Sequence, residues 1–453
     1  MVSPRILIKN ADVLVTMDDD RAEIAGGSIL VEGGVVRAVG QGVTKPQDGP
    51  CEVVDATGCV VTPGLINTHH HMFQSLTRAV PGGQDALLFG WLQTLYPIWA
   101  RMGPEDIHLS TQVALAELAR AGCSLSSDHL YLFPNGVRLD DSIAAAGEVG
   151  VRLTATRGSM SIGQSAGGLP PDSLVEAEAQ ILTDSARVID RFHGTEPGAM
   201  VQVALAPCSP FSVSRDLMRE SAGLAREKGV RLHTHLAENA EDVAYSLDRF
   251  GCRPGQYAED LGWVGSDVWH AHCVALDPGE IDLFGRTGTG VAHCPCSNGR
   301  LGSGIAPVRA MRRAGVPVGL GVDGSASNDS GDLLAEARQA LLVARLAGGA
   351  DAMSARTAVE IATRGGARVL GRLGELGSLE VGKRADLAIW RLDGLASAGA
   401  WDPVAALVLT GPHHVHHLMV EGRWIVSDGH LTTVDVQALA AQARGAVQRL
   451  AQG

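Results

Sequence analysis

Two pairs of histidines follow apolar segments of the chain, and their spacing indicates metal binding. His69 and His71 are two residues apart, as are His233 and His235. Side chains alternate along an extended strand, so both histidines of a pair point to the same face. Two imidazoles on one face suit a divalent metal ion such as zinc. For residues 69–71 alone, a histidine-rich surface turn is the other interpretation.

Three further groups that can bind a metal or transfer a proton stand at similar places. Glu238 comes shortly after the second histidine pair, His272 ends another apolar segment, and Asp323 directly follows a third. Taken singly, each histidine could equally be a hydrogen-bonded residue of the core. The aspartate could equally cap the helix that follows it. Together they favour a functional site, since one protein would have to place four such groups at one rim by chance.

These groups need strands to position them, and the middle of the chain alternates short apolar runs with longer helical stretches. Eight such units predict an α/β fold, a closed (β/α)₈ TIM barrel whose active site lies at the C-terminal ends of the strands. An open doubly wound sheet is the alternative, but no Gly-x-Gly-x-x-Gly follows the first strand, which disfavours its dinucleotide-binding form. The expected barrel strands are residues 59–67, 123–129, 151–157, 201–206, 230–236, 268–272, 290–294 and 316–322.

Both ends of the chain read as short strands separated by glycine turns. The first group lies within residues 5–60 and the second within residues 385–426. We expect the two ends to build one small β-domain together. The predicted organisation is therefore a β-sandwich part at 1–60, the barrel at 61–370, and a second β-sandwich part with a C-terminal helix at 371–453.

Composition limits the possible partners. The chain has 453 residues and a formal net charge of −13, which argues against nucleic acid or an anionic membrane as a partner. No signal peptide is recognisable, and no stretch reaches the ~18 apolar residues that span a bilayer. The cysteines form no Cys-x-x-Cys pair, so we expect them to be reduced and the protein to be cytoplasmic.

The order of these groups along the chain resembles the amidohydrolase superfamily, in its deaminase-like branch. The pattern is His-x-His after the first strand, His on the fifth, His on the sixth and Asp after the eighth. Pro63-Gly64 and the tail segment 376–387 are part of the resemblance, which covers nearly the whole chain. It implies a metal-dependent barrel flanked by a composite β-sandwich from both chain ends.

The resemblance also implies the metal ligands. They are His69, His71, His235 and Asp323, holding one divalent ion per subunit, zinc or alternatively iron. Binuclear relatives often have a lysine at the end of the fourth strand. No lysine stands there in this sequence, so a mononuclear site is expected.

The implied chemistry is hydrolysis of a small ring compound by metal-activated hydroxide. A divalent ion lowers the pKa of bound water from 15.7 to about 7. Asp323 would accept the water proton, and Glu238 would protonate a ring nitrogen of the substrate. His272 would hydrogen-bond the attacking oxygen. His233 would orient a neighbour or simply pack.

Four residues are candidate substrate contacts, and each has a structural alternative. Gln74 can donate and accept at the amide-like edge of an oxidised purine, or it is a solvated helix residue. Trp91 would form part of the pocket wall, or it lies in the hydrophobic core. Arg157 would contact an extra carbonyl group of the substrate, or it forms a buried ion pair. Cys208 would contact the same group, or it is an inert thiol in the core.

The chain is similar to guanine deaminases, including Gln74, but lacks the Arg-Phe pair that they carry after the proline ending the fourth strand. Pro207-Cys208-Ser209 stands there instead. The segments 69–78, 157–160 and 163–171 resemble bacterial 8-oxoguanine deaminases most closely. That resemblance implies conversion of 8-oxoguanine to uric acid and ammonia.

Related functions stay open at this point. s-Triazine hydrolases, pterin deaminases and methylthioadenosine/S-adenosylhomocysteine deaminases share the metal pattern. The last group usually has a Leu-Arg-Gly run, which residues 76–79 lack. A different class is an inactive amidohydrolase-like scaffold, which should purify without stoichiometric metal. By resemblance, homo-oligomers are common.

Two further groups of residues are not assigned to the site. We expect the histidine-rich run 413–417 to be a surface strand rather than a metal site. Ser297 and Asn298 are expected to shape the loop after the seventh strand. Ser327 or Asn328 is expected to cap the helix that follows the eighth.

Overall fold

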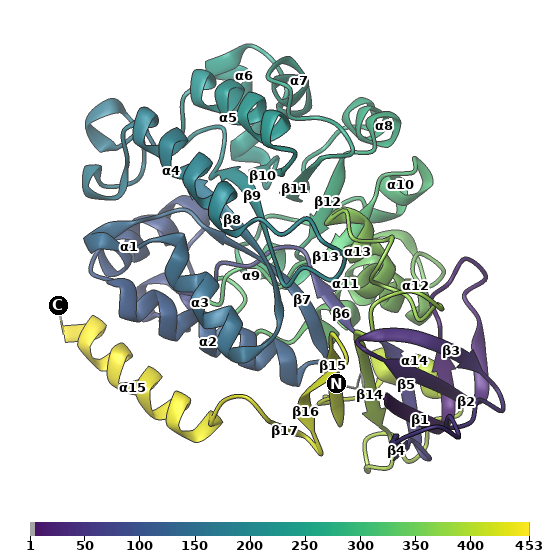
Figure 1. Cartoon of the computed structure of the whole chain (residues 1–453). Helices are drawn as coiled ribbons and strands as arrows, with labels where there is room; N and C mark the ends of the chain where they lie inside the picture. Colours follow the sequence, from purple (N-terminus) through teal and green to yellow (C-terminus); the bar gives the residue numbers. More distant parts are fainter. Residues whose placement is uncertain (1–4, 453) are drawn as a thin grey trace.

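Eight parallel strands close a barrel at the centre of the protein (Figure 1). The computed structural model describes residues 5–452. Neighbours around the barrel follow the chain order, and the last strand closes on the first through the Leu320–Asn67 pair. The predicted TIM barrel is therefore confirmed. Its strands are β6 (Leu65–Asn67), β7 (Cys123–Leu130), β8 (Arg152–Ser159), β9 (Val201–Pro207), β10 (Arg231–Leu236), β11 (Val268–His272), β12 (Gly290–His293) and β13 (Val318–Leu320).

Helices surround the barrel and return the chain from one parallel strand to the next. Their ends follow local sequence signals: α5 begins after Ser214, whose side chain accepts a hydrogen bond from Leu217 N, and ends at Gly229 with φ 69°. The helices of the barrel are α1 (Leu88–Trp99), α2 (Pro104–Arg120), α3 (Leu139–Val149), α4 (Glu178–Phe192), α5 (Arg215–Lys228), α6 (Ala240–Phe250), α7 (Pro254–Asp260), α8 (Pro278–Thr287), α9 (Pro295–Arg300), α10 (Val308–Arg313), α11 (Leu333–Gly348), α12 (Ala355–Glu360) and α13 (Gly366–Val369).

A second sheet of nine strands combines both ends of the chain, as predicted. Its two halves join where β5 pairs with β14 in antiparallel register. The N-terminal strands are β1 (Arg5–Val15), β2 (Glu23–Glu32), β3 (Val35–Gly40), β4 (Glu52–Asp55) and β5 (Cys59–Pro63), and the C-terminal strands are β14 (Leu387–Arg391), β15 (His417–Val420), β16 (Arg423–Ser427) and β17 (His430–Leu431). Helix α14 (Pro403–Leu409) joins β14 to β15, and α15 (Val436–Gln452) runs beside α2 (Figure 1).

The first predicted barrel strand, residues 59–67, is two strands rather than one. Residues up to Pro63 belong to the terminal sheet, and the barrel strand begins at Leu65. The chain changes sheets at Gly64, where a Cβ would collide with the Ser124 side chain. The apolar run is continuous because both halves are buried, so periodicity alone did not reveal the break.

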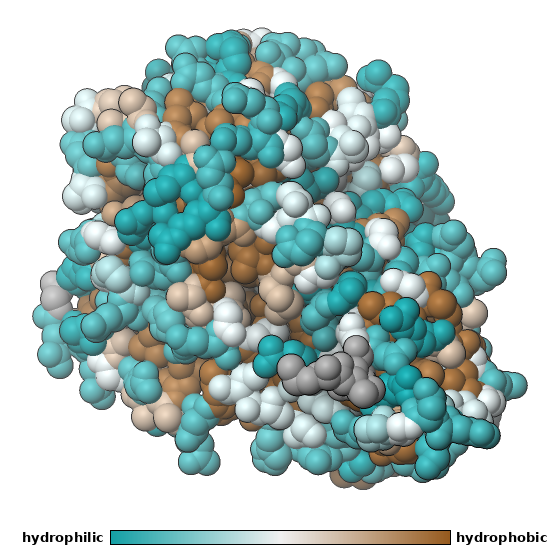
Figure 2. All heavy atoms as spheres, viewed as in Figure 1, coloured by the Kyte–Doolittle hydropathy of each residue, from teal (hydrophilic) through white to brown (hydrophobic). Residues whose placement is uncertain are grey.

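A buried ion pair joins the barrel to the terminal sheet. Arg152 of β8 donates to both carboxylate oxygens of Asp386, at 2.8 and 2.9 Å. On the outside, hydrophilic residues predominate on the face shown in Figure 2, with hydrophobic residues in patches between them. None of the helices within residues 5–452 is both long and apolar enough to cross a membrane.

Candidate metal centre and active site

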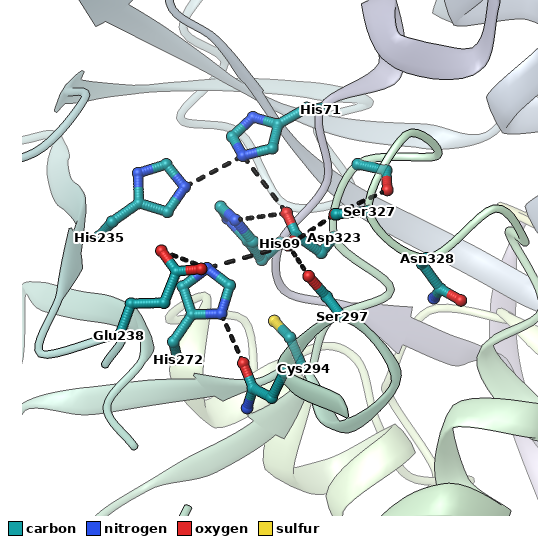
Figure 3. Close-up of polar contacts among 12 residues, drawn as sticks. His69, His71, His235, Glu238, His272, Cys294, Ser297, Asp323, Ser327 and Asn328 are labelled. Carbon is teal, nitrogen blue, oxygen red and sulfur yellow. Dashed lines mark hydrogen bonds and ion pairs between the residues drawn. The ribbon is translucent and has the colours of Figure 1, made fainter. Parts of the chain in front are cut away.

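The polar groups predicted to act together meet at the C-terminal ends of the barrel strands, as Figure 3 shows. Two histidines follow β6, one lies on β10, one ends β11, and the aspartate follows β13. All are buried. Six side chains thus converge from four strand ends: His69, His71, His235, Glu238, His272 and Asp323.

Four ligand atoms surround one point of this cluster. His69 Nε2 lies 3.2 Å and His71 Nε2 3.3 Å from Asp323 Oδ1. His71 Nε2 is 3.0 Å from His235 Nε2. These distances place three imidazole nitrogens and a carboxylate oxygen around a space that a single ion could fill.

Hydrogen bonds on the opposite ring nitrogens fix the tautomers of two of these imidazoles. His71 Nδ1 donates to the His129 carbonyl at 2.7 Å, and His235 Nδ1 donates to the Cys208 carbonyl at 2.6 Å. A neutral imidazole has one N–H, so Nε2 of each ring presents a lone pair to the cluster. Burial lowers the pKa of both rings and keeps them neutral.

His69 is oriented by His233, whose role the sequence left open. His233 Nδ1 donates to the Trp269 carbonyl at 3.0 Å, so its Nε2 must accept a hydrogen bond. His69 Nδ1 donates to that nitrogen at 2.8 Å. His69 Nε2 is then a bare lone pair that faces the cluster.

This arrangement fits a divalent cation. Among the described residues, His69 Nε2 and Asp323 Oδ1 are buried without a hydrogen-bond partner. Lone pairs that face one another in a buried space repel, and a positive ion between them removes the repulsion. Three histidine nitrogens with a carboxylate oxygen are donors that zinc takes in proteins.

Two residues beside the ligands are suited to proton transfer. Burial raises the pKa of Glu238 to about 7, with the nearby Asp242 adding to the rise. Glu238 Oε2 lies 3.7 Å from His272 Nε2, which in turn is 3.9 Å from Asp323 Oδ2. Although burial opposes it, the carboxylates of Glu238 and Asp323 raise the pKa of His272.

Helix α9 braces this group from one side. Asn298 Oδ1 accepts from His272 Nδ1 at 2.9 Å, and Ser297 Oγ donates to Asp323 Oδ2 at 2.5 Å. Ser327 Oγ also donates to Asp323 Oδ2, at 3.1 Å. The sequence assigned these three residues only to loop shape and helix capping, because their partners come from other strands.

The backbone at three strand ends lies in the left-handed region although no glycine is present. Ala237 has φ 50°, His272 φ 68° and Asp323 φ 62°. Such conformations cost about 1–3 kcal/mol each and are common at functional sites. They turn the side chains at the ends of β10, β11 and β13 toward the centre.

A cavity opens onto this cluster. Apolar and aromatic side chains line it together with His71, His235, Glu238, His272 and Asp323. Gln74, Trp91 and Cys208 lie in its wall as the sequence predicted. The other wall residues are Leu88, Leu92, Tyr96, Tyr131, Ser209, Phe211, Leu301 and Ser327.

Comparison with known proteins places the chain in a family. The model of the amidohydrolase family matches residues 60–425, which is most of the chain. The chain belongs to the amidohydrolase family. This confirms the predicted superfamily, and with it the barrel and composite sheet.

This amidohydrolase is 47% identical to 8-oxoguanine deaminase of Pseudomonas aeruginosa, over 95% of its own length and 96% of the relative. It is 39% identical to an isoxanthopterin deaminase from an unknown prokaryotic organism, covering 99% and 97% of the two chains. The solved structure of atrazine chlorohydrolase from Arthrobacter aurescens, complexed with zinc, matches with a TM-score of 0.93 and 34% identity, covering 98% and 100%. These relatives are deaminases and hydrolases, and the chain is an enzyme of their family.

Three wall residues of the amidohydrolase present defined groups to the cavity. Gln74 Oε1 accepts from Ala326 N at 3.3 Å, while its buried Nε2 has no partner among the described residues and is free to donate. Trp91 Nε1 donates to the Ala326 carbonyl at 3.0 Å, so the indole is held as a wall. Burial raises the pKa of Cys208 to about 12, which keeps the thiol neutral.

The structure does not bring Arg157 to the cavity of the amidohydrolase. Its guanidinium pairs with Glu176 and Asp184, each at 2.8 Å, and stacks on Phe133 at 3.8 Å. The side chain points out of the barrel toward α4, and its donors are used there. Of the two interpretations of Arg157, the buried ion pair is the one observed.

Sequence analysis missed three aromatic residues of the cavity, Tyr96, Tyr131 and Phe211. Tyr131 directly follows β7, so its position at a strand end was an available signal. Phe211 lies in the loop after β9 and packs edge-on against Phe89 of α1, with ring centroids 5.6 Å apart. This contact spans residues far apart in the chain, and nothing local in the sequence indicated it.

Proposed function

We propose that this amidohydrolase deaminates 8-oxoguanine hydrolytically, giving uric acid and ammonia. The observation that supports the substrate is the 47% identity to 8-oxoguanine deaminase over 95% of the chain. The reaction class is supported by the geometry: bare imidazole nitrogens and a carboxylate line a cavity beside a carboxyl group that titrates near neutral pH.

The proposed cofactor is one zinc ion, held by His69, His71, His235 and Oδ1 of Asp323. The zinc complex of the related atrazine chlorohydrolase supports the choice of metal. The absence of lysine at the end of β9 supports a single ion. A divalent ion bound there lowers the pKa of a water molecule to about 7 and so supplies a nucleophile at neutral pH.

Asp323 and His272 activate and orient the attacking water. Asp323 Oδ2 is held by two serine hydroxyls and faces His272, so it is placed to take the proton that the water loses. His272 Nε2 donates a hydrogen bond toward the attacking oxygen, while Asn298 holds its other nitrogen. Charge that develops on that oxygen is stabilised by this fixed donor.

Glu238 supplies the proton that the ring takes up as water adds. With a pKa near 7 it exists in both forms at neutral pH, which suits a group that first donates and then accepts. It protonates a ring nitrogen as the water oxygen adds to the neighbouring amino-bearing carbon. The proton that Asp323 took from water then reaches the amino group, the C–N bond breaks, and ammonia leaves. The added hydroxyl returns its proton to Glu238 as the carbonyl forms.

Neutral groups bind the substrate in this proposal. The free Nε2 of Gln74 donates to a ring carbonyl, and the Cys208 thiol contacts the far edge of the ring. Trp91 and Tyr131 form apolar faces. A wall without a charged guanidinium fits a neutral oxidised purine, and the proposal drops Arg157 as a contact.

Ammonia release from a panel of substrates tests the proposal. The zinc-loaded enzyme is assayed with 8-oxoguanine, guanine, isoxanthopterin, hydroxyatrazine and methylthioadenosine. We expect kcat/KM for 8-oxoguanine to exceed the others by on the order of 10²-fold, since the donors of the site match its carbonyl groups. Isoxanthopterin is the second candidate because of the 39% identical relative. Higher kcat/KM for the pterin or the triazine would replace the proposed substrate.

A further inference from the structure

A further histidine, His129, lies beside the candidate ligands. It is fully buried near the end of β7. Its Nε2 donates to the Ala206 carbonyl of β9 at 2.8 Å. The neutral ring therefore has a bare lone pair on Nδ1, and that buried nitrogen has no partner among residues 5–452.

His129 contacts two of the proposed ligands in different ways. Its ring stacks on His235 with centroids 4.9 Å apart and planes 20° from parallel. His272 also stacks on His235, at 5.5 Å and 18°, so two imidazoles pack against this ring. The backbone carbonyl of His129 accepts the Nδ1 hydrogen of His71. One residue thus restrains the orientation of both rings.

The His129 ring lies close to the centre. Ring nitrogens of His69, His71, His129 and His235 all lie within 4.8 Å of one another. A buried lone pair without a donor is unfavourable. A cation held nearby compensates it, because a lone pair interacts favourably with positive charge in a buried, low-dielectric site.

We propose that His129 is a positioning residue for the metal. Its ring holds His235 in the ligating orientation, and its unprotonated Nδ1 favours a cation in the centre. This inference rests on the metal site of the proposed function. Substitution of the side chain is therefore expected to weaken metal binding itself, besides any effect on catalysis.

His270 of β11 provides a matched control on another strand of the same barrel. It is also fully buried, its Nε2 donates to the Trp263 carbonyl at 2.9 Å, and its Nδ1 is without a partner in the described part of the chain. Its ring packs on Phe284 of α8, with centroids 5.3 Å apart, instead of on a ligand. The two histidines share burial and hydrogen bonding and differ in what they face.

The test compares His129→Phe with His270→Phe, each stripped of metal and titrated with cobalt(II) against a competing chelator. We expect His129→Phe to bind cobalt about 10–100-fold more weakly, as residues that orient ligands typically do when replaced. The visible absorption of its cobalt complex should also change, since the geometry around His235 relaxes. His270→Phe should match the wild type in affinity and spectrum.

The inference would be overturned if His129→Phe had the cobalt affinity and absorption spectrum of the wild type. It would also be overturned if His270→Phe lost as much cobalt affinity as His129→Phe. Thermal melting of the metal-free proteins identifies a variant that fails to fold. His129→Gln, which retains a donor for Ala206 but lacks the ring, then takes its place with the same expected loss. If the wild type itself binds no divalent ion, the proposed function fails as well. If the wild type binds cobalt and His129→Phe binds it equally well, the proposed function stands and only the inference about His129 fails.

Discussion

Each proposed ligand imidazole has one ring nitrogen engaged by an acceptor elsewhere in the barrel. Carbonyls of His129 and Cys208 hold His71 and His235, and the His233 ring holds His69. The other nitrogen of each ring is therefore unprotonated before any ion arrives. Pre-set tautomers reduce the reorganisation that metal binding would otherwise require.

Glu238→Gln tests the role of the acid at the scale of one residue. Glutamine keeps the shape but has no proton to transfer, so we expect kcat to fall by on the order of 10²–10⁴-fold. Zinc content should not change, because Glu238 is not among the proposed ligands. Steady-state ammonia release and elemental analysis measure the two quantities.

Glu241→Gln is the control for that variant. Glu241 lies three positions further along the chain, is exposed, and belongs to the first turn of α6. It should retain wild-type activity. A kcat for Glu238→Gln close to that of Glu241→Gln would rule out Glu238 as the acid.

At the scale of elements, strand ends supply the reacting groups and short helices hold them. Helix α9 fixes His272 and Asp323 through Asn298 and Ser297. The short helix η1 (Met72–Leu76), which contains Gln74, is held to β7 by Asp128, whose Oδ1 accepts from Met72 N at 2.8 Å. The substrate contact and the metal site thus depend on links between neighbouring strands.

Asp128 gives this link a pH dependence. Burial raises its pKa from 3.8 to about 7. Between these values the folded state keeps a proton that the unfolded state loses, so rising pH destabilises the fold by roughly 1 kcal/mol per unit. The stability that protonated Asp128 contributes is fully present below the unfolded-state pKa of 3.8 and is lost as pH rises through about 7.

Asp128→Asn removes that titration and keeps the acceptor for Met72 N. We expect the melting temperature of the wild type to fall relative to that of the variant as pH increases between about 5 and 8. Other buried carboxyl groups contribute equally to both proteins and cancel in the difference. Parallel curves of melting temperature against pH would show that Asp128 is ionised in the folded protein.

At the scale of the molecule, the barrel and the terminal sheet are joined by buried charge. Arg152 and Asp386 form a bidentate pair with side chains that are 0% and 2% exposed. Arg152→Met leaves the carboxylate buried without its partner, which costs about 3–5 kcal/mol. Calorimetry should show a lower melting temperature for Arg152→Met. The double variant Arg152→Met/Asp386→Leu should recover part of the lost stability, because neither charge is then buried alone.

Metal affinity should not change in Arg152→Met. Arg152 is the first residue of β8, and the proposed ligands lie at the opposite ends of the strands. A large loss of metal affinity would mean that the two ends of the barrel are coupled.

Metal removal affects the whole protein. An ion that binds only the folded state stabilises it, by about 3 kcal/mol at a hundredfold excess over Kd. We expect the chelator-treated enzyme to be inactive and to melt at a lower temperature, with zinc restoring both. Full activity in a protein shown by elemental analysis to lack metal would exclude the proposed mechanism.

The order of residues by itself determined the barrel and the residues at its rim. His69, His235 and Asp323 each follow an apolar run, and parallel strands of a closed barrel bring their C-terminal ends together. Knowing which residue ends a strand was therefore enough to predict that these side chains meet. Gln74 and Cys208 were instead predicted from hydrogen-bonding chemistry and from the family resemblance.

Only the tertiary structure decided which atoms face one another. Arg157 also stands near a strand end, yet its partner Asp184 lies 27 residues away on α4 and turns it outward. The Ser297–Asp323 and His129–His235 contacts likewise join separate βα units. Periodicity specifies the face of a strand, whereas hydrogen bonds and ring stacking depend on distances across the barrel, which exist only once it has closed.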